Sequence, residues 1–371
     1  MIKVAKHYDA IQGYIPAVPV EVLAKSLGFS PQEMIKADAN ENPYGASGKV
    51  ADALVKACYP HLYPDPGAVN LCSKLADFVA APADQIMVSN GADELILMLI
   101  RLFLEPGDTL INLPPTFDMY DLHAKLSAAN VLEIPRKADF SIDYAALRKA
   151  AMQPECKLVF LTTPNNPDGQ LMPKAEIEAL LDLPIMIVVD EAYIEFSSND
   201  NFGRENSIIS RVPEVQNLIV LRTFSKWAGL AGLRVGYGIF PAWLMPHLWK
   251  IKQPYNVNCA AQAAAAACLD DLDYYQDTIQ SIIAERERMY KAFSALPNLK
   301  VLPSQTNFLL CQLQGHTTED VCDKLKKEGI LIRGYNKPSC PNALRISIMK
   351  PEQNDRILQG LEKILKGGTP S

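Results

Sequence analysis

The chain contains an acid and an amine whose positions suit covalent chemistry on an aldehyde. Asp190 ends the apolar run 185–189, where a carboxylate needs a cation or hydrogen-bond donors to offset its lost hydration. The protonated nitrogen of a pyridine ring would be such a cation, and protonation makes the ring an electron sink. Lys226 follows the next strand-like run, and its amine can form an imine with an aldehyde cofactor once its pKa is lowered. Taken singly, Asp190 could cap a helix or join an ion pair, and Lys226 could be a solvated surface lysine.

Two features could bind a phosphate group. Residues 91–93 directly follow a strand-like run and open a helical pattern, so free backbone N–H groups would point at an anion. Arg234 and Ser225 can donate further hydrogen bonds, and a guanidinium close to Lys226 would lower the pKa of its amine. The Gly-rich segment 229–232 lacks the spacing of a nucleotide fingerprint, and no G-x-G-x-x-G follows an early strand. A dinucleotide-dependent oxidoreductase is therefore not favoured.

Short apolar runs alternate with helical patterns between residues 85 and 222. This rhythm is typical of an α/β fold whose mainly parallel sheet is covered by helices. In such a sheet, ligands bind in the crevice beyond the carboxyl ends of the strands. Gly91, Asn166, Asp190 and Lys226 come at or shortly after the ends of predicted strands, so we expect them to meet at one edge of the sheet.

The pattern changes after Pro254. The Ala-rich run 259–269 is too short to span a bilayer and predicts a buried helix that Asn258 caps. A further helical stretch continues to about Leu296 after a break near Asp270, and shorter strands and helices follow, as in a smaller α+β domain. We therefore expect three parts: an N-terminal arm with part of the small domain (residues 1–42), a large cofactor-binding domain (43–257), and a linking helix with the C-terminal small domain (258–371).

Bulk composition narrows the classes of function. With 49% hydrophobic residues the chain can build a sizeable core, and its 21% of charged residues is not a disordered composition. A formal net charge of −6 disfavours nucleic-acid binding, which requires a basic face. The N-terminus shows no secretory pattern, and no apolar run is long enough to cross a membrane. Eight scattered cysteines without zinc-like spacing, and five histidines without a partner pattern, predict reduced thiols, no metal site and a cytoplasmic protein.

An ordered set of motifs resembles that of the fold-type I aminotransferases, which use pyridoxal 5'-phosphate. Within that class the set is most similar to the histidinol-phosphate aminotransferases, and the resemblance runs from Asn40–Gly45 to Leu344–Ser347. It implies a large domain with a mainly parallel, seven-stranded sheet flanked by helices, plus a smaller α+β domain. The motifs are Ser-Asn-Gly-Ala-Asp-Glu (89–94), Pro-Pro-Thr-Phe-Asp-Met-Tyr (114–120), Thr-Pro-Asn-Asn-Pro-Asp-Gly (163–169), Asp-Glu-Ala-Tyr (190–193), Thr-Phe-Ser-Lys (223–226) and Gly-Leu-Ala-Gly-Leu-Arg-Val-Gly-Tyr (229–237).

The resemblance implies a role in cofactor binding for each of several residues. Lys226 becomes the Schiff-base lysine and the proton shuttle, and Asp190 pairs with the pyridine nitrogen. Asn166 and Tyr193 hydrogen-bond the phenolic oxygen of the cofactor, and Phe117 stacks on its ring. The positions that correspond to the phosphate site are Gly91, Ala92, Asp93, Ser225 and Arg234.

The resemblance also implies how substrate and partner subunit bind. Tyr14 of the arm, Arg333 and Arg345 would hold the substrate, with Asn166 beside them. Two guanidiniums can hold the phosphate of histidinol phosphate in one half-reaction and a carboxylate of glutamate or 2-oxoglutarate in the other. Tyr63 would reach the cofactor phosphate of a neighbouring subunit, so we expect a homodimer with shared active sites.

Four positions depart from the family pattern, namely Phe117, Asp168, Trp227 and Met349. None of these departures removes a catalytic group. Two alternatives stay open on the same fold: an aromatic amino-acid aminotransferase, and a decarboxylase of a phosphorylated amino acid such as threonine phosphate. A pyridoxal-binding regulator without turnover is the alternative from another class, although no basic helix-turn-helix segment is evident.

Overall fold

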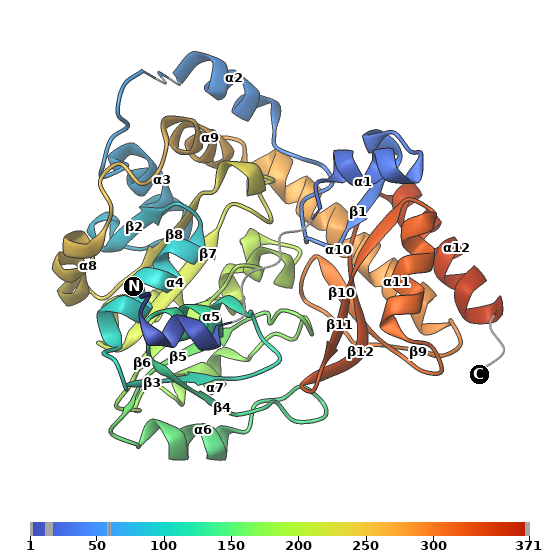
Figure 1. Cartoon of the computed structure of the whole chain (residues 1–371). Helices are drawn as coiled ribbons and strands as arrows, with labels where there is room; N and C mark the ends of the chain where they lie inside the picture. The colour runs from blue at the N-terminus through green and yellow to red at the C-terminus, as the bar shows by residue number, and fades with distance from the viewer. Residues whose placement is uncertain (1–2, 12–17, 58, 60, 368–371) are drawn as a thin grey trace.

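The computed structural model describes residues 3–11, 18–57, 59 and 61–367. Two lobes, each built around one sheet, are connected by the long helix α10 (Leu272–Ser294) (Figure 1). Within the described ranges no helix is both long and apolar enough to cross a membrane. The predicted substrate residue Tyr14 lies outside the described residues.

The larger lobe contains a seven-stranded sheet in which every strand is parallel to the others except β8, which is antiparallel to both of its neighbours. The prediction of a mainly parallel sheet is therefore confirmed. In spatial order the strands are β2 (Ile86–Ser89), β8 (Gly236–Ile239), β7 (Leu218–Thr223), β6 (Met186–Asp190), β5 (Cys156–Thr162), β3 (Thr109–Asn112) and β4 (Asn130–Glu133).

Strand β8 was not predicted from the sequence. Its residues alternate glycine with larger side chains, a composition that favours turns over strands. A Cβ on Gly236 would lie 2.6 Å from the backbone nitrogen of Ala92, so the strand needs glycine to pass close to the start of a helix. Pairing on both edges stabilises the strand in spite of its composition.

The central strands are buried on both faces. On β5, Leu158 and Phe160 point into one apolar cluster, whereas Val159 and Leu161 point into the other. This alternation buries a parallel strand between two helical layers. Helices α4 (Ala92–Phe103), α5 (Met119–Leu126) and α8 (Met245–Ile251) cover the first face. The other face is covered by helices that include α3 (Val69–Val79), α6 (Tyr144–Ala151), α7 (Lys174–Glu178) and α9 (Cys259–Leu269).

The Ala-rich helix α9 lies in the core, as predicted. The side chain of Asn258 caps it by accepting a hydrogen bond from the Ala261 nitrogen, and most of the alanines are buried. Small side chains allow close packing against helix α2 (Gly48–Ala57), which lies above α9 in Figure 1. The helix ends at Leu269 and α10 begins at Leu272, so the predicted break near Asp270 is confirmed.

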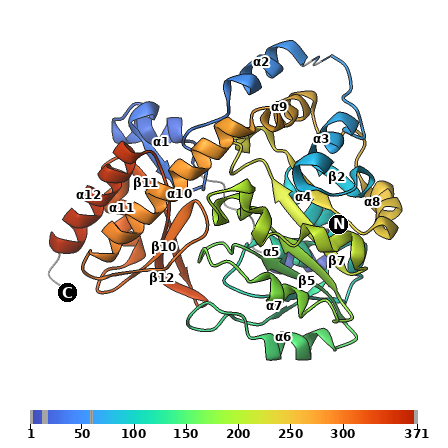
Figure 2. The same cartoon turned by 180° about the vertical axis from the view of Figure 1, so that it is seen from behind.

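The smaller lobe is a five-stranded sheet with helices on one side. In spatial order its strands are β1 (Ile35–Ala37), β11 (Ile330–Lys337), β12 (Cys340–Ser347), β10 (Phe308–Leu313) and β9 (Leu299–Val301). Strand β1 pairs in parallel with β11, and the other pairs are antiparallel. The helices of this lobe are α1 (Val20–Leu27), α11 (Thr318–Lys327) and α12 (Pro351–Gly367), which pack beside α10 in the rear view (Figure 2).

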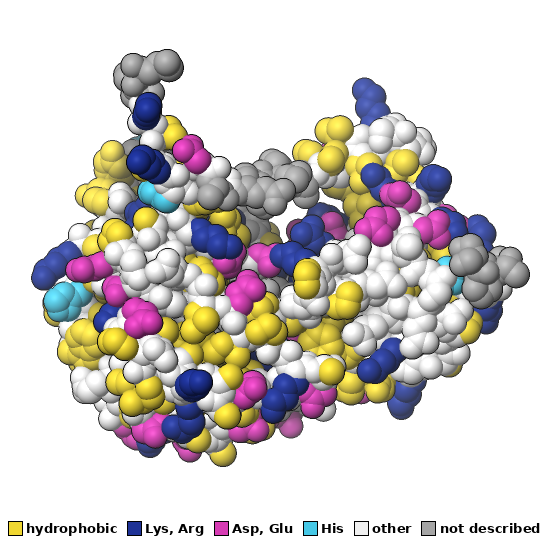
Figure 3. All heavy atoms as spheres, turned by 60° about the horizontal axis from the view of Figure 1, so that its bottom comes forward, with side chains coloured by type: hydrophobic (Ala, Val, Ile, Leu, Met, Phe, Trp, Pro, Cys, Tyr) yellow, Lys and Arg dark blue, Asp and Glu magenta, His cyan; other side chains and the backbone are white. Residues whose placement is uncertain are grey.

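Short 3-10 helices complete the described structure. They are η1 (Lys6–Ala10), η2 (Pro31–Glu33), η3 (Ala83–Gln85), η4 (Ile194–Ser197), η5 (Asn201–Asn206), η6 (Ile209–Glu214), η7 (Ala231–Leu233) and η8 (Ala242–Leu244). The surface is hollowed between the two lobes, and basic and acidic side chains gather around this hollow (Figure 3).

Candidate active site

One cavity lies at the edge of the large sheet where parallel strands end. Asp190 is the last residue of β6 and lies opposite Thr162, the last residue of β5. Ser225 and Lys226 come shortly after β7, which ends at Thr223. The cavity is lined by nine of the residues predicted from the sequence: Ala92, Asp93, Phe117, Asn166, Asp190, Tyr193, Ser225, Lys226 and Arg234.

Asp190 is buried at the bottom of this cavity. Its Oδ2 accepts a hydrogen bond from the Tyr120 hydroxyl at 2.6 Å, and its Oδ1 accepts one from the Ala192 nitrogen at 3.0 Å. Burial raises the pKa of this carboxyl to about 6, although both donors oppose the rise. Both donors are neutral, so a cation beside Asp190 would restore its ordinary ionisation.

Lys226 is half-buried in the same cavity. Its Nζ donates a hydrogen bond to the carbonyl oxygen of Ala39 at 3.1 Å and lies 5.9 Å from the centre of the Tyr193 ring. Burial, followed by the positive charge of Arg345, lowers the pKa of the amine to about 8. A much larger fraction of the amine is therefore neutral and nucleophilic near neutral pH than in a free lysine.

The N-terminus of α4 forms the anion-binding end of the cavity. Gly91 has a φ of +78°, and a Cβ there would lie 2.6 Å from Nη2 of Arg234. The Arg234 guanidinium donates to Asp93 Oδ2 at 3.0 Å and to Ser225 Oγ at 3.4 Å. Backbone N–H groups, a guanidinium and a hydroxyl thus converge where a phosphate would sit.

A second cluster joins the two lobes at the cavity mouth. Arg345 of β12 donates from Nη1 to Asn166 Oδ1 at 2.6 Å and to the Tyr335 hydroxyl at 3.2 Å, and from Nη2 to the Asp38 carbonyl at 2.8 Å. Its side chain is 7% exposed, and its buried Nε has no hydrogen-bond partner among the described residues. A buried donor without a partner costs free energy, so this guanidinium is suited to an anionic ligand.

Arg333 lies directly opposite Arg345 in the β11–β12 ladder. Paired residues of an antiparallel ladder place their side chains on the same face, so two guanidiniums share the face that turns toward the cavity. Arg333 is exposed, unlike Arg345. Together they could hold a doubly charged anion.

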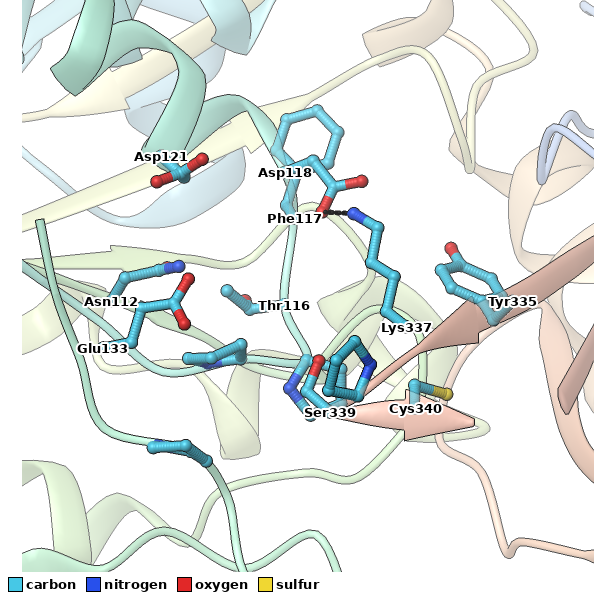
Figure 4. A pocket seen from close by; sticks show the side chains of 14 residues that line it. Asn112, Thr116, Phe117, Asp118, Asp121, Glu133, Tyr335, Lys337, Ser339 and Cys340 are labelled. Carbon is cyan, nitrogen blue, oxygen red and sulfur yellow. Dashed lines mark hydrogen bonds and ion pairs between the residues drawn. The ribbon is translucent and has the colours of Figure 1, made fainter. Parts of the chain in front are cut away.

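A wider hollow of about 330 Å³ opens on the outer side of Phe117 (Figure 4). Phe117 lines both this hollow and the cavity that contains Lys226. Lys337 of β11 crosses the hollow to form an ion pair with Asp118 at 2.6 Å. Strand β11 thus has two contacts near the site: Lys337 bonds Asp118, the residue after Phe117, and the Tyr335 hydroxyl accepts a hydrogen bond from Arg345 of β12.

Tyr63 does not line the cavity of its own chain. Its side chain is 81% exposed and stacks on Tyr255 with ring centroids 4.5 Å apart. Tyr59 and Leu62 beside it are also exposed. An exposed apolar group of this kind suits contact with another molecule.

A buried ion cluster supports the strands behind the site. Arg222 of β7 donates from Nη2 to Glu191 Oε2 at 2.9 Å, and Ser207 and the Ile208 nitrogen satisfy the same carboxylate. Glu195 lies 3.6 Å from Arg222 at its nearest oxygen, and burial raises the pKa of Glu195 to about 8. The cluster fixes the residues next to Asp190 and Thr223, so it positions the site indirectly.

Two of the four departures have a structural explanation. Trp227 is fully buried in an aromatic group with Phe78 and Tyr275, where a smaller residue would leave a cavity. Asp168 is buried, and its carboxylate accepts hydrogen bonds from Asn165 Nδ2 and from the Gln170 nitrogen. Neither Trp227 nor Asp168 lines the cavity. These two departures therefore change the packing around the site and leave its polar groups in place.

Three contributors to the site were not predicted from the sequence. Tyr120 donates to Asp190, Thr162 shares a hydrogen bond with the Tyr120 hydroxyl, and Asn40 donates to the Tyr193 hydroxyl. Tyr120 stands three residues after Phe117, and this spacing could have indicated that the two rings are in contact. Asn40 carried no such signal, because its contact depends on folding over a long stretch of chain.

The residues present fit pyridoxal phosphate. The buried carboxylate of Asp190 needs a cation, the glycine-lined start of α4 needs an anion, and the Lys226 amine lies in the same cavity. Bound pyridoxal phosphate supplies an aldehyde and an electron-withdrawing ring, which stabilises negative charge on the substrate carbon that bears the amine.

Fold and site together define a pyridoxal-phosphate-dependent enzyme of fold type I. Residues 32–361 match the family model described as aminotransferase class I and II, and the chain belongs to this family.

Curated relatives and solved structures agree with this assignment. The chain is 45% identical to the histidinol-phosphate aminotransferase of Roseiflexus castenholzii, over 96% of each chain. It is 41% identical to the chloroplastic histidinol-phosphate aminotransferase of Nicotiana tabacum, over 96% of this chain and 85% of that one. The fold is similar to that of the histidinol-phosphate aminotransferase from Sinorhizobium meliloti solved with pyridoxal-5'-phosphate, with a TM-score of 0.88, 26% identity and coverage of 99% and 98%. The predicted fold class and cofactor are thus confirmed.

Proposed function

We propose that the enzyme transfers an amino group between histidinol phosphate and 2-oxoglutarate, with imidazole acetol phosphate and glutamate as the products. The observation that carries this proposal is the position of Arg333 opposite Arg345, whose buried Nε has no hydrogen-bond partner in the part of the chain that the structure describes. Two guanidiniums on one face match a phosphate in one half-reaction and a carboxylate in the other. The names of the relatives at 40–45% identity support the same substrate.

Each side chain of the cavity would have its own role in the reaction. The neutral amine of Lys226 would take the proton from the substrate carbon that bears the amino group and later give it up again, as a general acid–base. Asp190 would pair with the ring nitrogen of the cofactor. Tyr193 and Asn166 would hydrogen-bond its phenolic oxygen, and Phe117 would stack on its ring.

The phosphate of the cofactor would lie at the start of α4. There the backbone of residues 91–93 and the side chains of Ser225 and Arg234 offer donors to it. Tyr14 would close the substrate side from the arm.

We further propose a cytoplasmic homodimer in which Tyr63 enters the site of the partner subunit. The 81% exposure of Tyr63 and the apolar groups beside it support a contact with a second copy. Cell fractionation tests the compartment, and a chloroplast location, as in the name of the tobacco relative, is the alternative outcome.

The substrate is tested by mixing the purified, cofactor-loaded enzyme with histidinol phosphate and 2-oxoglutarate. We expect glutamate and imidazole acetol phosphate by mass spectrometry, and loss of the visible absorbance of the bound cofactor when 2-oxoglutarate is omitted. Lys226→Ala should abolish both signals. Faster turnover of phenylalanine or tyrosine would favour an aromatic aminotransferase, and release of carbon dioxide from threonine phosphate would favour a decarboxylase.

Arg333→Ala tests the anion clamp. Loss of a charge-assisted hydrogen bond should raise KM for histidinol phosphate by about tenfold to a hundredfold. Arg356→Ala, on an exposed face of α12, is the matched control and should leave KM unchanged. An unchanged KM in Arg333→Ala would disprove the clamp while leaving the aminotransferase assignment intact.

A further inference from the structure

Three successive residues of the segment after β1 each contact a different side chain of the site. The contacts join the Asp38 carbonyl to Arg345 Nη2 (2.8 Å), the Ala39 carbonyl to Lys226 Nζ (3.1 Å), and Asn40 Nδ2 to the Tyr193 hydroxyl (3.0 Å). The third contact differs from the first two because it is made by a side chain, so a substitution can change it without altering the backbone.

The other polar groups of Asn40 all form hydrogen bonds with residues of the small lobe. Its backbone nitrogen donates to Ser347 Oγ at 2.9 Å, the Ser347 hydroxyl donates to Asn40 Oδ1 at 3.0 Å, and Asn307 Nδ2 donates to the Asn40 carbonyl at 3.0 Å. Its side chain is 1% exposed and its φ is +56°, a conformation that asparagine tolerates better than most residues. With Oδ1 engaged by Ser347, the NH₂ end of the amide must face Tyr193.

This arrangement decides the direction of the hydrogen bond at Tyr193. A phenolic hydroxyl has one proton to donate and lone pairs to accept. Because Asn40 occupies a lone pair, the Tyr193 proton stays available to the cavity that Tyr193 lines.

We propose that Asn40 is a positioning residue that makes Tyr193 a hydrogen-bond donor toward the phenolic oxygen of the cofactor. This role rests on the proposed function of Tyr193 in the site. Burial raises the pKa of Tyr193, which keeps the proton on its oxygen, while Arg345 and the Asn40 amide restrain the rise.

Asn40→Asp tests the role, because aspartate has the same shape but only acceptors. The new carboxylate would accept the Tyr193 proton and withdraw it from the cofactor. We expect kcat to fall about tenfold, the effect of one hydrogen bond, with KM for the amino donor changed less than twofold. The apparent pKa of the visible absorbance of the bound cofactor should rise by about one unit, because its deprotonated form loses a donor.

Two further variants complete the comparison. Asn40→Gly accepts the positive φ and removes the donor without adding an acceptor, so it should give a smaller change in the same direction. Asn298→Asp is the matched control, since Asn298 is exposed and has a similar φ of +60° in the loop before β9. It should titrate and turn over like the parent enzyme.

The decisive measurement repeats Asn40→Asp in a Tyr193→Phe background. If Asn40 acts through the Tyr193 hydroxyl, the substitution should cause no further shift in the absorbance titration. An equal shift in both backgrounds, or a parent-like titration in Asn40→Asp, would overturn the proposal. Should Asn40→Asp unfold, Asn40→Gly carries the same comparison. Because the titration needs no substrate, a wrong substrate assignment would leave this test readable.

Discussion

At the scale of single residues, the site depends on an amine whose pKa is lowered by its surroundings. Burial and then the charge of Arg345 lower the pKa of Lys226 to about 8. The rate at which cofactor-free protein combines with pyridoxal phosphate should therefore rise with pH and level off above about pH 8, because only the neutral amine attacks. Stopped-flow absorbance over a pH series measures this midpoint.

Arg345→Gln should move the midpoint to higher pH, since the second largest cause of the lowered pKa is removed. Arg333→Gln is the control, because Arg333 is exposed and is not among the main causes of the shift. A midpoint that stays near pH 8 in Arg345→Gln would show that Arg345 does not contribute to the lowered pKa of Lys226.

Prediction from the sequence succeeded best for residues with a local signal. Asp190 ends an apolar run and Lys226 comes shortly after another, so their place near a strand end can be deduced from the neighbouring residues. Asn40 and Thr162 act through partners far away in the chain, and no local pattern reports such pairs. The roles of the individual site residues remain predictions that the variants proposed for them can test.

At the scale of elements, β6 and β7 are joined behind the site by the Arg222, Glu191 and Glu195 cluster. Burial raises the pKa of Glu195 from 4.5 to about 8, so the folded protein holds a proton that the unfolded chain releases between these values. The free energy of unfolding should therefore fall as pH rises through this range.

Glu195→Gln should remove this part of the pH dependence and raise the unfolding temperature at about pH 8 relative to the parent protein. Thermal unfolding at mildly acidic and mildly alkaline pH provides the comparison. Glu105→Gln replaces an exposed carboxyl and should leave the pH dependence unchanged. If the two variants respond alike, Glu195 is ionised in the folded state through its contact with Arg222.

The elements that the sequence failed to predict share a physical cause. Strand β8 contains two glycines, of which Gly236 suits its close approach to the start of α4, and β1 is only three residues long. Both strands are stabilised by pairing with neighbours that lie elsewhere in the chain. Longer elements such as α9 and α10 carry their own periodicity or cap, and the sequence was sufficient for them.

At the scale of the whole molecule, a shared active site can be tested by mixing inactive variants. In a hybrid of Lys226→Ala and Tyr63→Ala subunits, one site would combine an intact Lys226 with an intact Tyr63 from the partner subunit. After the two variants are refolded together in equal amounts, about half of the dimers should be hybrids, so we expect activity at limiting cofactor to recover toward about a quarter of the parent value.

A hybrid of Lys226→Ala with Asp190→Ala is the control for this mixing experiment. Both residues line the cavity of one chain, so neither site of that hybrid would be complete. Recovery in the control as well, or in neither mixture, would show that Tyr63 serves its own chain or no site at all.

The pairing of β1 with β11 has a consequence for the order of synthesis. Residues 35–40 leave the ribosome early, yet their partners in β11, Asn307 and Ser347 belong to the last part of the chain. The sheet of the large lobe, which ends at Ile239, can form while translation continues, whereas the segment that contacts Lys226 has to wait. A chaperone that protects residues 35–40 would therefore act after the large lobe has been synthesised and before the chain is complete.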